Sequence, residues 1–216
     1  MGACLSHIRY TSEILLVEAN AVSDNPLIFV EQNEILSGGN FHGEPLAFAL
    51  DYLAIALSAL AGISERRIER MVNPALNEGL PAFLAAEAGL NSGFMLPQVT
   101  AAALVSENKV LAHPASVDSI TTSANKEDYV SMGMSAALKL ERVVANVTHV
   151  LAIEAAAAAQ AVEFLAPLKT SPRLQRAHSA IREVSPVVDR DRVLADDFAK
   201  LAKAIDEGKL AQVLKD

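Results

Sequence analysis

The sequence has no tryptophan, a single cysteine and few aromatic residues. Aromatic side chains make up 5% of the 216 residues, whereas hydrophobic residues make up 51%. The lone thiol, Cys4, cannot form an internal disulfide, which fits a reducing compartment, so we expect a cytoplasmic protein. A core of aliphatic and alanine side chains is typical of packed helices rather than of β-sandwiches or barrels. The composition therefore predicts an all-α protein.

The chain also lacks an excess of basic residues. Its net charge is −8, which argues against nucleic acid as a partner. Residues 1–12 contain no continuous apolar stretch of the signal-peptide kind. Val143–Leu168 is apolar enough to suggest a membrane span, but Glu154 and Glu163 within it would be costly inside a bilayer. We therefore expect neither a nucleic-acid nor a membrane partner.

Common signatures of metal, nucleotide and nucleophile chemistry are missing. No two of the five histidines lie three or four residues apart and there is no cysteine pair, so we expect no zinc-type metal site. The glycines of residues 38–43 do not have the spacing of a phosphate-binding or dinucleotide-binding loop. The serines that could act as nucleophiles lie outside the nucleophile-elbow pattern: Ser37, Ser92 and Ser123.

The longest helical pattern covers about residues 128–166. It contains no proline and one glycine, Gly133, and Ala155–Ala159 would let a neighbouring helix approach closely. At about 1.5 Å per residue this helix would be roughly 58 Å long, which exceeds the roughly 45 Å diameter of a compact chain of this size. An elongated subunit that packs against other chains would explain this length. Glu154 lies on the apolar stripe, where we expect it to pair with another helix rather than to act in catalysis.

The remaining pattern predicts an elongated bundle of long helices with one small β-hairpin. Leu27–Val30 and Glu34–Leu36 form the expected hairpin, and residues 73–97 are expected to be irregular. Ser171 is the expected N-cap of the first of the carboxy-terminal helices, which cover about residues 172–207. Nothing forces a domain boundary within 1–216. The other expected helices cover residues 4–22, 45–72, 98–112 and, at the carboxy-terminal end, 172–184 and 191–207.

Three polar loops precede expected helices: residues 38–43, 89–98 and 119–128. Helix N-termini have free N–H groups and a partial positive charge, which suit a carboxylate ligand. The alternative is that these segments are capping loops at one end of a bundle. The spacing of the residues leaves both interpretations open.

These loops carry a resemblance to a known family. Asn20–Pro26, Gly38-Gly-Asn-Phe-His-Gly43, Leu90-Asn-Ser-Gly-Phe-Met95 and His113–Ser119 resemble, in order, the motifs of the aromatic amino acid ammonia-lyases. Ser123-Ala-Asn-Lys-Glu-Asp-Tyr-Val-Ser-Met132 resembles the version found in bacterial histidine ammonia-lyases. The resemblance covers essentially the whole chain. It implies the ammonia-lyase/fumarase-like helical fold, in which long helices of four subunits form a central bundle, and hence a homotetramer.

The resemblance also implies an electrophilic cofactor. Members of this family eliminate ammonia with a methylidene-imidazolone that forms from an internal Ala-Ser-Gly tripeptide. This sequence contains neither that tripeptide nor the Gln-Asp-x-Tyr-x-x-Arg segment that provides further active-site groups. The resemblance is therefore to the carboxy-terminal portion of the family, and Met1–Cys4 is similar to an internal stretch. We expect the cofactor in the intact enzyme, none formed within this chain, and no activity from the chain alone.

Five residues take roles from the matching motifs. Phe41 would line the substrate pocket, and Glu127 would face the side chain of the substrate as the catalytic candidate. A carboxylate suits an imidazole, which can donate a hydrogen bond or carry charge. Met95 stands where the plant phenylalanine enzymes typically have lysine, which favours histidine as the substrate. His42 and Asn125 are weaker substrate-binding candidates.

The resemblance thus implies a carbon-nitrogen lyase that converts L-histidine to urocanate and ammonia in the intact enzyme. Lys126, where the family usually has glutamine, is a departure that could favour the ionised form of Glu127 or point away from it. One alternative is a tyrosine or phenylalanine ammonia-lyase or aminomutase, against which Ser123–Asp128 weighs. The other is a non-catalytic helical assembly module.

Overall fold

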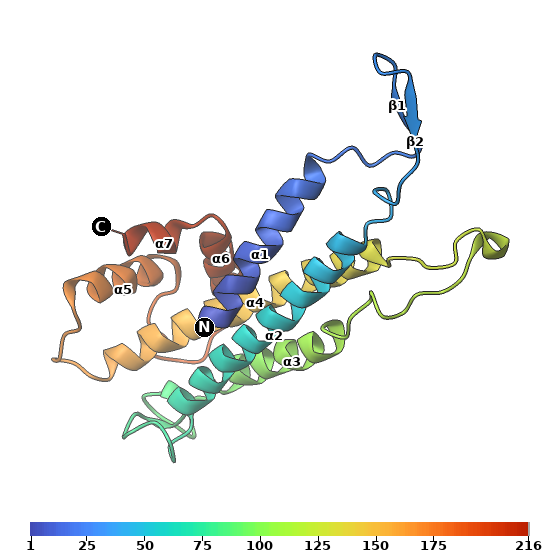
Figure 1. The fold of residues 1–216 in the computed structure, drawn as a ribbon. Helices are drawn as coiled ribbons and strands as arrows, with labels where there is room; N and C mark the ends of the chain where they lie inside the picture. The colour runs from blue at the N-terminus through green and yellow to red at the C-terminus, as the bar shows by residue number, and fades with distance from the viewer. Residues whose placement is uncertain (216) are drawn as a thin grey trace. The chain divides into compact units, whose positions relative to one another are not determined.

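The computed structural model describes residues 1–215, and most of them are helical (Figure 1). Strands β1 (Leu27–Phe29) and β2 (Glu34–Leu36) form an antiparallel hairpin in which Ile28 pairs with Ile35. The all-α class with one small hairpin is therefore confirmed. The helices are α1 (Gly2–Ala19), α2 (Glu44–Val72), α3 (Met95–Leu111), α4 (Gly133–Glu163), α5 (Pro172–Val184), α6 (Ala195–Asp206) and α7 (Lys209–Val213), with short 3₁₀ turns η1 (Ala82–Leu84) and η2 (Ser123–Asn125).

Helix α4 is shorter than the expected 128–166. Met132 has a φ of 59°, a left-handed conformation that an α-helix cannot include, so α4 begins at Gly133. With 31 residues, α4 is roughly 46 Å long at about 1.5 Å per residue, close to the roughly 45 Å expected for the diameter of a compact chain. Helix α4 is therefore shorter than the roughly 58 Å expected from the sequence.

Two other helix starts differ from expectation. Helix α3 begins at Met95 and includes Pro97, which is tolerated because the N–H groups of a first turn have no partner within the helix. The helix expected from residue 191 begins instead at Ala195, because Asp191 binds the loop before α3. Helix α7 was not expected. Ser171 caps α5 as expected, with its side chain accepting a hydrogen bond from the N–H of Leu174.

The chain divides into two compact units, and the first comprises Met1–Ser58 and Lys109–Val144. Helix α1 packs here on the first half of α2. The Thr11 hydroxyl donates to the carbonyl oxygen of Ala49 at 3.2 Å, and the rings of His7 and Tyr52 lie 4.1 Å apart. Asp51 accepts a hydrogen bond from the N–H of Ser116 at 2.8 Å, which joins α2 to the segment after α3.

The second unit comprises Ala59–Asn108 and the chain from Ala145 onward. Its core is built on the alanine-rich face of α4, whose small side chains allow the close approach expected of that stretch. Phe94, Leu84 and Leu201 are at most 1% exposed in this core. The alanines of α4 in the same cluster are Ala152, Ala156, Ala157 and Ala161.

Glu154 of α4 pairs with α2 in this unit. It forms an ion pair with Arg67, whose Nη2 lies 2.8 Å from Oε2, and it also accepts a hydrogen bond from the Ser64 hydroxyl at 2.5 Å. The hydrogen bond to Glu154 raises the pKa of Arg67 above its ordinary value, against the opposing effect of burial. The interpretation of Glu154 as a carboxylate paired with another helix is confirmed.

Helices α2 and α4 are each long and apolar enough to cross a membrane by length and composition alone. Of their most apolar windows, 39% and 56% respectively are buried inside the protein, as in the core helices of many globular proteins. This is weak evidence for a membrane protein, and the expectation of no membrane partner stays a prediction.

Candidate functional site

The first unit brings two of the motif loops into contact through His42. Its Nε2 atom lies 2.8 Å from the carbonyl oxygen of Tyr129, and the two rings stack with centroids 5.9 Å apart. Because a carbonyl oxygen only accepts hydrogen bonds, Nε2 carries the proton. Nδ1 of the same ring lies 3.7 Å from a carboxylate oxygen of Glu44, the first residue of α2. His42 therefore joins the loop before α2 to the loop that holds Glu127.

Glu127 stands at the end of a tight turn. The backbones of Thr122 and Glu127 pair with each other, at 2.9 and 3.4 Å between N and O. Between them Ser123, Ala124 and Asn125 all have a left-handed φ, of 53°, 51° and 67°. Each such non-glycine residue costs of order 1–3 kcal/mol, and backbone strain of this kind clusters at functional sites. The turn leaves Asn125 and Glu127 exposed to solvent.

The two apolar candidates belong to different units. Phe41 precedes His42 in the first unit and is 52% exposed, whereas Met95 is the first residue of α3, in the second unit, and is 36% exposed. The structure thus connects His42 with the loop of Asn125 and Glu127 and places Met95 on a separate element. The assignment of these residues to a substrate site stays a prediction.

The second unit shows what binds the N-terminus of α3. One carboxylate oxygen of Asp191 accepts from the N–H of Ser92 at 2.8 Å, and the other accepts from the N–H of Gly93 at 2.9 Å. The two hydrogen bonds hold the pKa of Asp191 below its usual value. Both N–H groups belong to the loop that precedes Met95, the first residue of α3, so a carboxylate of this chain holds this loop in place.

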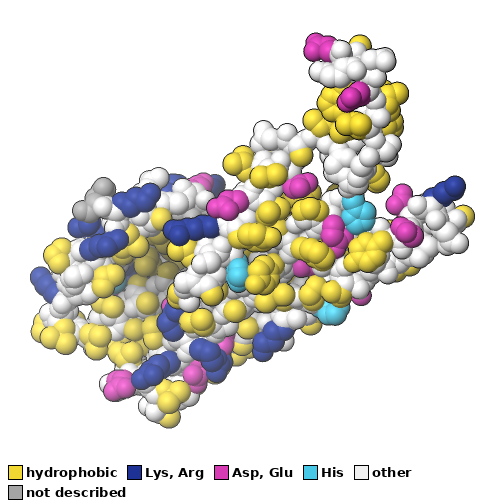
Figure 2. Space-filling model, viewed as in Figure 1, with side chains coloured by type: hydrophobic (Ala, Val, Ile, Leu, Met, Phe, Trp, Pro, Cys, Tyr) yellow, Lys and Arg dark blue, Asp and Glu magenta, His cyan; other side chains and the backbone are white. Residues whose placement is uncertain are grey.

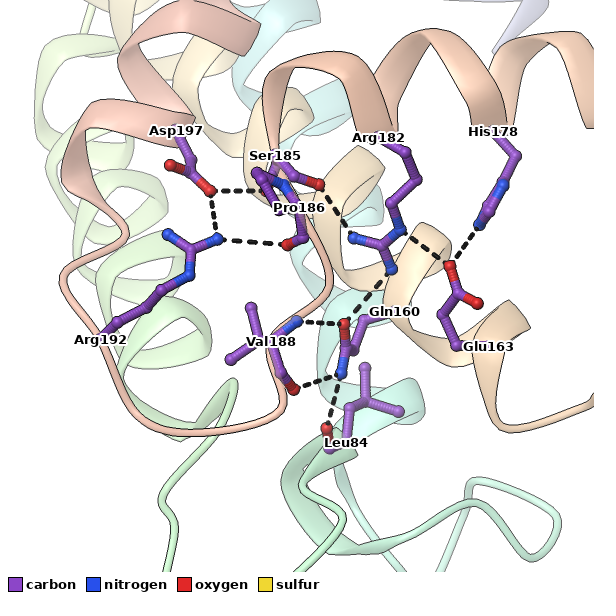
Figure 3. A network of polar contacts seen from close by, with 10 residues as sticks. All are labelled: Leu84, Gln160, Glu163, His178, Arg182, Ser185, Pro186, Val188, Arg192 and Asp197. Atoms are coloured by element: carbon purple, nitrogen blue, oxygen red, sulfur yellow. Dashed lines mark hydrogen bonds and ion pairs between the residues drawn. The ribbon is translucent and has the colours of Figure 1, made fainter.

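Asp191 lies on a segment that is anchored by buried polar contacts (Figure 3). Gln160 of α4 is 1% exposed, donates from Nε2 to the carbonyl oxygen of Val188 at 2.8 Å and accepts from the N–H of Val188 at 3.1 Å. Its amide also donates to the carbonyl oxygen of Leu84 at 3.4 Å. Arg182 of α5 donates to Gln160 at 3.3 Å and to Glu163 at 2.9 Å. One buried glutamine thus joins α4, α5 and the segment that follows α5.

A second polar cluster attaches the segment between α5 and α6 to α6 itself. Asp197 accepts from the Ser185 hydroxyl at 2.9 Å and from Nη2 of Arg192 at 2.7 Å (Figure 3). Burial by itself would raise the pKa of Asp197, but the hydrogen bonds from Arg192 and Ser185 bring it below its usual value. Arg192 also donates to the carbonyl oxygen of Pro186 at 3.2 Å. The segment between α5 and α6 is therefore held at both ends.

An open pocket of about 760 Å³ lies beside this segment. Its walls are mainly apolar side chains of α3, α4 and α6, such as Leu96, Ile153 and Phe198, together with Asp191 and Arg192. Both charged groups already have partners within the chain. Among residues 1–215, no group of three or more histidine, cysteine or acidic side chains is arranged to hold a metal ion.

The long helices and the motif loops define the helical lyase class that the motifs predicted. A family model described as aromatic amino acid lyase matches residues 1–183, and the chain belongs to this family. The resemblance drawn from the motifs is thereby confirmed.

Similar proteins show how far the likeness extends. The chain is 65% identical to a histidine ammonia-lyase of Koribacter versatilis, over 97% of this chain and 43% of that protein, and 55% identical to one of Symbiobacterium thermophilum, over 99% and 42%. The chain thus spans less than half the length of these curated relatives. Among solved structures, histidine ammonia-lyase from Trypanosoma cruzi matches 99% of this chain and 42% of its own, with a TM-score of 0.95 and 48% identity. Tyrosine aminomutase from Streptomyces globisporus matches 99% of this chain and 41% of its own, with a TM-score of 0.94 and 39% identity.

Proposed function

We propose that this chain forms part of an enzyme that eliminates ammonia from L-histidine and releases urocanate. The observation that carries the proposal is the 65% identity, over 97% of this chain, to a protein named histidine ammonia-lyase. The Ser123–Met132 loop supports it, because its turn presents a carboxylate, Glu127, on a strained and exposed backbone. A carboxylate can accept a hydrogen bond from an imidazole and can stabilise its charged form.

Each candidate residue has a role in this proposal. Glu127 contacts the imidazole of the substrate, and Phe41 packs against it. Met95, on α3, offers an apolar side chain that carries no competing charge. His42 orients the Phe41 loop through its hydrogen bond with the carbonyl oxygen of Tyr129. Asn125 offers a solvent-exposed side-chain amide on the same turn as Glu127 and is the weaker contact.

The cofactor of the family is expected to come from residues outside these 216. A methylidene-imidazolone supplies an electrophile that activates the amino acid, and it forms from Ala-Ser-Gly, a tripeptide that this sequence does not contain. The residues described above therefore do not form the group, and we assign them only to the binding of the substrate. The single Cys4 supports our further proposal that the enzyme is cytoplasmic.

A tyrosine aminomutase or a related lyase for tyrosine or phenylalanine is the second candidate. The observation that favours it is the TM-score of 0.94 and 39% identity to the Streptomyces globisporus tyrosine aminomutase. The helical fold alone does not separate these activities, since one fold can carry several reactions. A non-catalytic helical assembly module is the third candidate. It predicts that no amino acid is turned over, even when the missing amino-terminal portion is supplied.

Substrate preference tests the proposal directly. The chain would be fused behind the amino-terminal portion of a family member whose sequence contains Ala-Ser-Gly, which gives a chimeric enzyme. We expect kcat/KM for histidine to exceed the values for tyrosine and phenylalanine by at least roughly 100-fold. A phenyl ring has no hydrogen-bond donor for the carboxylate of Glu127, and a phenol, unlike an imidazole, cannot carry a positive charge beside it. The measurement is product absorbance with each amino acid. A preference for tyrosine would support the aminomutase or tyrosine lyase instead.

We also propose that the chain associates with further copies of itself, as the tetramer implied by the family resemblance requires. Figure 2 shows hydrophobic side chains gathered on the hairpin of β1 and β2. The paired residues Ile28 and Ile35 share one face and are 67% and 69% exposed, whereas Phe29 and Leu36 on the other face are 41% and 50% exposed. On α1, Leu16 and Val17 are 67% and 64% exposed. Contiguous apolar surface of this kind is typical of protein interfaces, and an isolated hairpin is at best marginally stable in water.

Light scattering at low micromolar concentration would measure this association. We expect a species heavier than the 22.9 kDa monomer. Replacing Ile28 and Ile35 together by threonine, which keeps the strand preference, should shift the population toward smaller species, whereas Thr100→Ser on α3 should not. A monodisperse 22.9 kDa species that melts cooperatively would contradict the proposal.

A further inference from the structure

We propose that Asp191 is a positioning residue for the substrate pocket, because it holds the loop that sets the place of Met95. The inference rests on the proposed function, in which Met95 lines that pocket. Asp191 itself lies beyond residues 1–183, the part of the chain that the family model matches. It is 98 and 99 residues away from the two groups that it binds, so no local motif reveals the contact.

The contact is reciprocal and uses both oxygens of the carboxylate. Ser92 and Gly93 each donate a backbone N–H to a different oxygen, and the N–H of Asp191 donates in turn to the side-chain oxygen of Asn91 at 3.1 Å. Hydrogen bonds to a charged acceptor are stronger than neutral ones. Three bonds therefore fix the loop before α3 in both position and orientation.

The loop itself has little freedom at this point. Gly93 has a φ of +51°, and a Cβ atom there would lie 2.6 Å from the carbonyl oxygen of Phe83. The next residue, Phe94, is 1% exposed, and its N–H donates to the same carbonyl at 2.8 Å. The N–H of Met95 bonds the carbonyl oxygen of Ser92 at 3.1 Å. The backbone of Met95 is thus one turn away from the residues that Asp191 holds.

The other side of the contact is equally fixed. Asp191 follows Val188, which is bound to Gln160, and precedes Arg192, which is bound to Asp197 (Figure 3). Because Asp191 is held on both sides in this way, the position of the segment between α5 and α6 determines the position of the loop before α3. A cap that served only the stability of α3 would need no such support, because a side chain at the helix start commonly does this locally.

Hydrogen exchange of the whole chain tests the first half of the proposal. Asp191→Asn keeps the size of the side chain but replaces one acceptor oxygen by an N–H₂ group. We expect the amides of Ser92 and Gly93 to exchange roughly 10-fold or more faster, while amides in the middle of α4 keep their rates. Asp189→Asn, an exposed acid two residues away, is the matched control and should leave both amides protected. Unchanged exchange at Ser92 and Gly93 in Asp191→Asn would overturn the proposal.

A double-mutant cycle in the chimeric enzyme tests the second half. Asp191→Asn should lower kcat/KM for histidine roughly 10-fold, mainly through KM, and should have little further effect once Met95 is replaced by alanine. Asp191→Glu should recover part of the loss. Additive effects of Asp191→Asn and Met95→Ala would show that Asp191 contributes only to stability and would overturn the inference.

The two possible failures are distinguishable. If the unsubstituted chimera turns over no amino acid, the proposed function is wrong, and the role of Met95 in substrate binding is wrong as well. If the chimera is active but the cycle is additive, the proposed function stands and only the role of Asp191 is wrong.

Discussion

We expect no urocanate to form when the 216-residue chain is incubated alone with L-histidine. The elimination removes a proton from the β-carbon, which is barely acidic, and expels ammonia, which is a poor leaving group. Acid and base side chains typically contribute about 10²–10⁴ each. The proposed reaction also requires the electrophile that the family resemblance implies, and the Ala-Ser-Gly tripeptide expected to form it is not part of this sequence.

The exposure of the candidate residues leads to the same expectation. Phe41 is 52% exposed, and Asn125 and Glu127 also lie on the solvent side of their turn. A catalytic site holds its substrate in a defined orientation and excludes water, and both requirements need walls on several sides. These residues provide one wall. A small zwitterion such as histidine would therefore bind weakly to the chain alone.

The measurement follows the ultraviolet absorbance of urocanate, with circular dichroism to show that the chain is helical under the same conditions. The parallel sample contains the chain co-expressed with an amino-terminal portion of a family member that carries Ala-Ser-Gly. Activity only in the mixture would indicate a site completed by other segments. Turnover by the chain alone would contradict the expectation and would show that these residues suffice for catalysis.

The sequence predicted the elements whose causes are local. The hairpin at Leu27–Leu36, the cap at Ser171 and the alanine-rich core face of α4 each depend on nearby residue preferences, and all are found. Glu154 could also be interpreted correctly, because a carboxylate on an apolar helix face needs a charged or polar partner. The identity of that partner, Arg67, could not be read from the sequence.

Long-range contacts determine what the sequence did not predict. The start of α4 is displaced because residues 119–132 form a turn, in which the hydroxyl oxygen of Ser119 accepts from the N–H of Val130 at 2.8 Å. The start of α6 is displaced because Asp191 is bound to a loop 98 residues earlier. The contact between His42 and Tyr129 joins two motifs that lie 87 residues apart. At the starts of α4 and α6, the helical preference of the segment is weaker than a hydrogen bond that the residue pattern does not reveal.

The motifs named candidate residues that the spacing of side chains alone did not single out. Phe41, Met95 and Glu127 have no metal-like or triad-like arrangement, so residue chemistry by itself left function and capping open. The structure adds the turn that exposes Glu127 and the hydrogen bond that joins its loop to His42. It also shows that the loop before α3 is held by an internal carboxylate, Asp191, through the N–H groups of Ser92 and Gly93.

Replacing Glu127 by glutamine in the chimeric enzyme should lower kcat/KM for histidine by roughly 10- to 10³-fold. Glutamine has nearly the same shape, so the substitution removes the charge and keeps the volume of the side chain. The turn should survive, because Thr122 pairs with the backbone of residue 127 and not with its side chain. The melting temperature is therefore expected to change little, as for most exposed substitutions.

The controls separate a loss of charge from a general loss of structure. Glu31→Gln, an exposed acid in the turn of the hairpin, should leave kcat/KM unchanged. Phe41→Ala should also lower activity, through poorer positioning of the substrate, but it removes apolar packing and should therefore weaken the binding of tyrosine and phenylalanine as well as that of histidine. Glu127→Gln should act most strongly on histidine, because only an imidazole can carry a positive charge that the carboxylate stabilises. If histidine turnover is unchanged in Glu127→Gln while the fold is intact, Glu127 is a residue of the turn alone, and the assignment of histidine as the substrate loses its chemical basis.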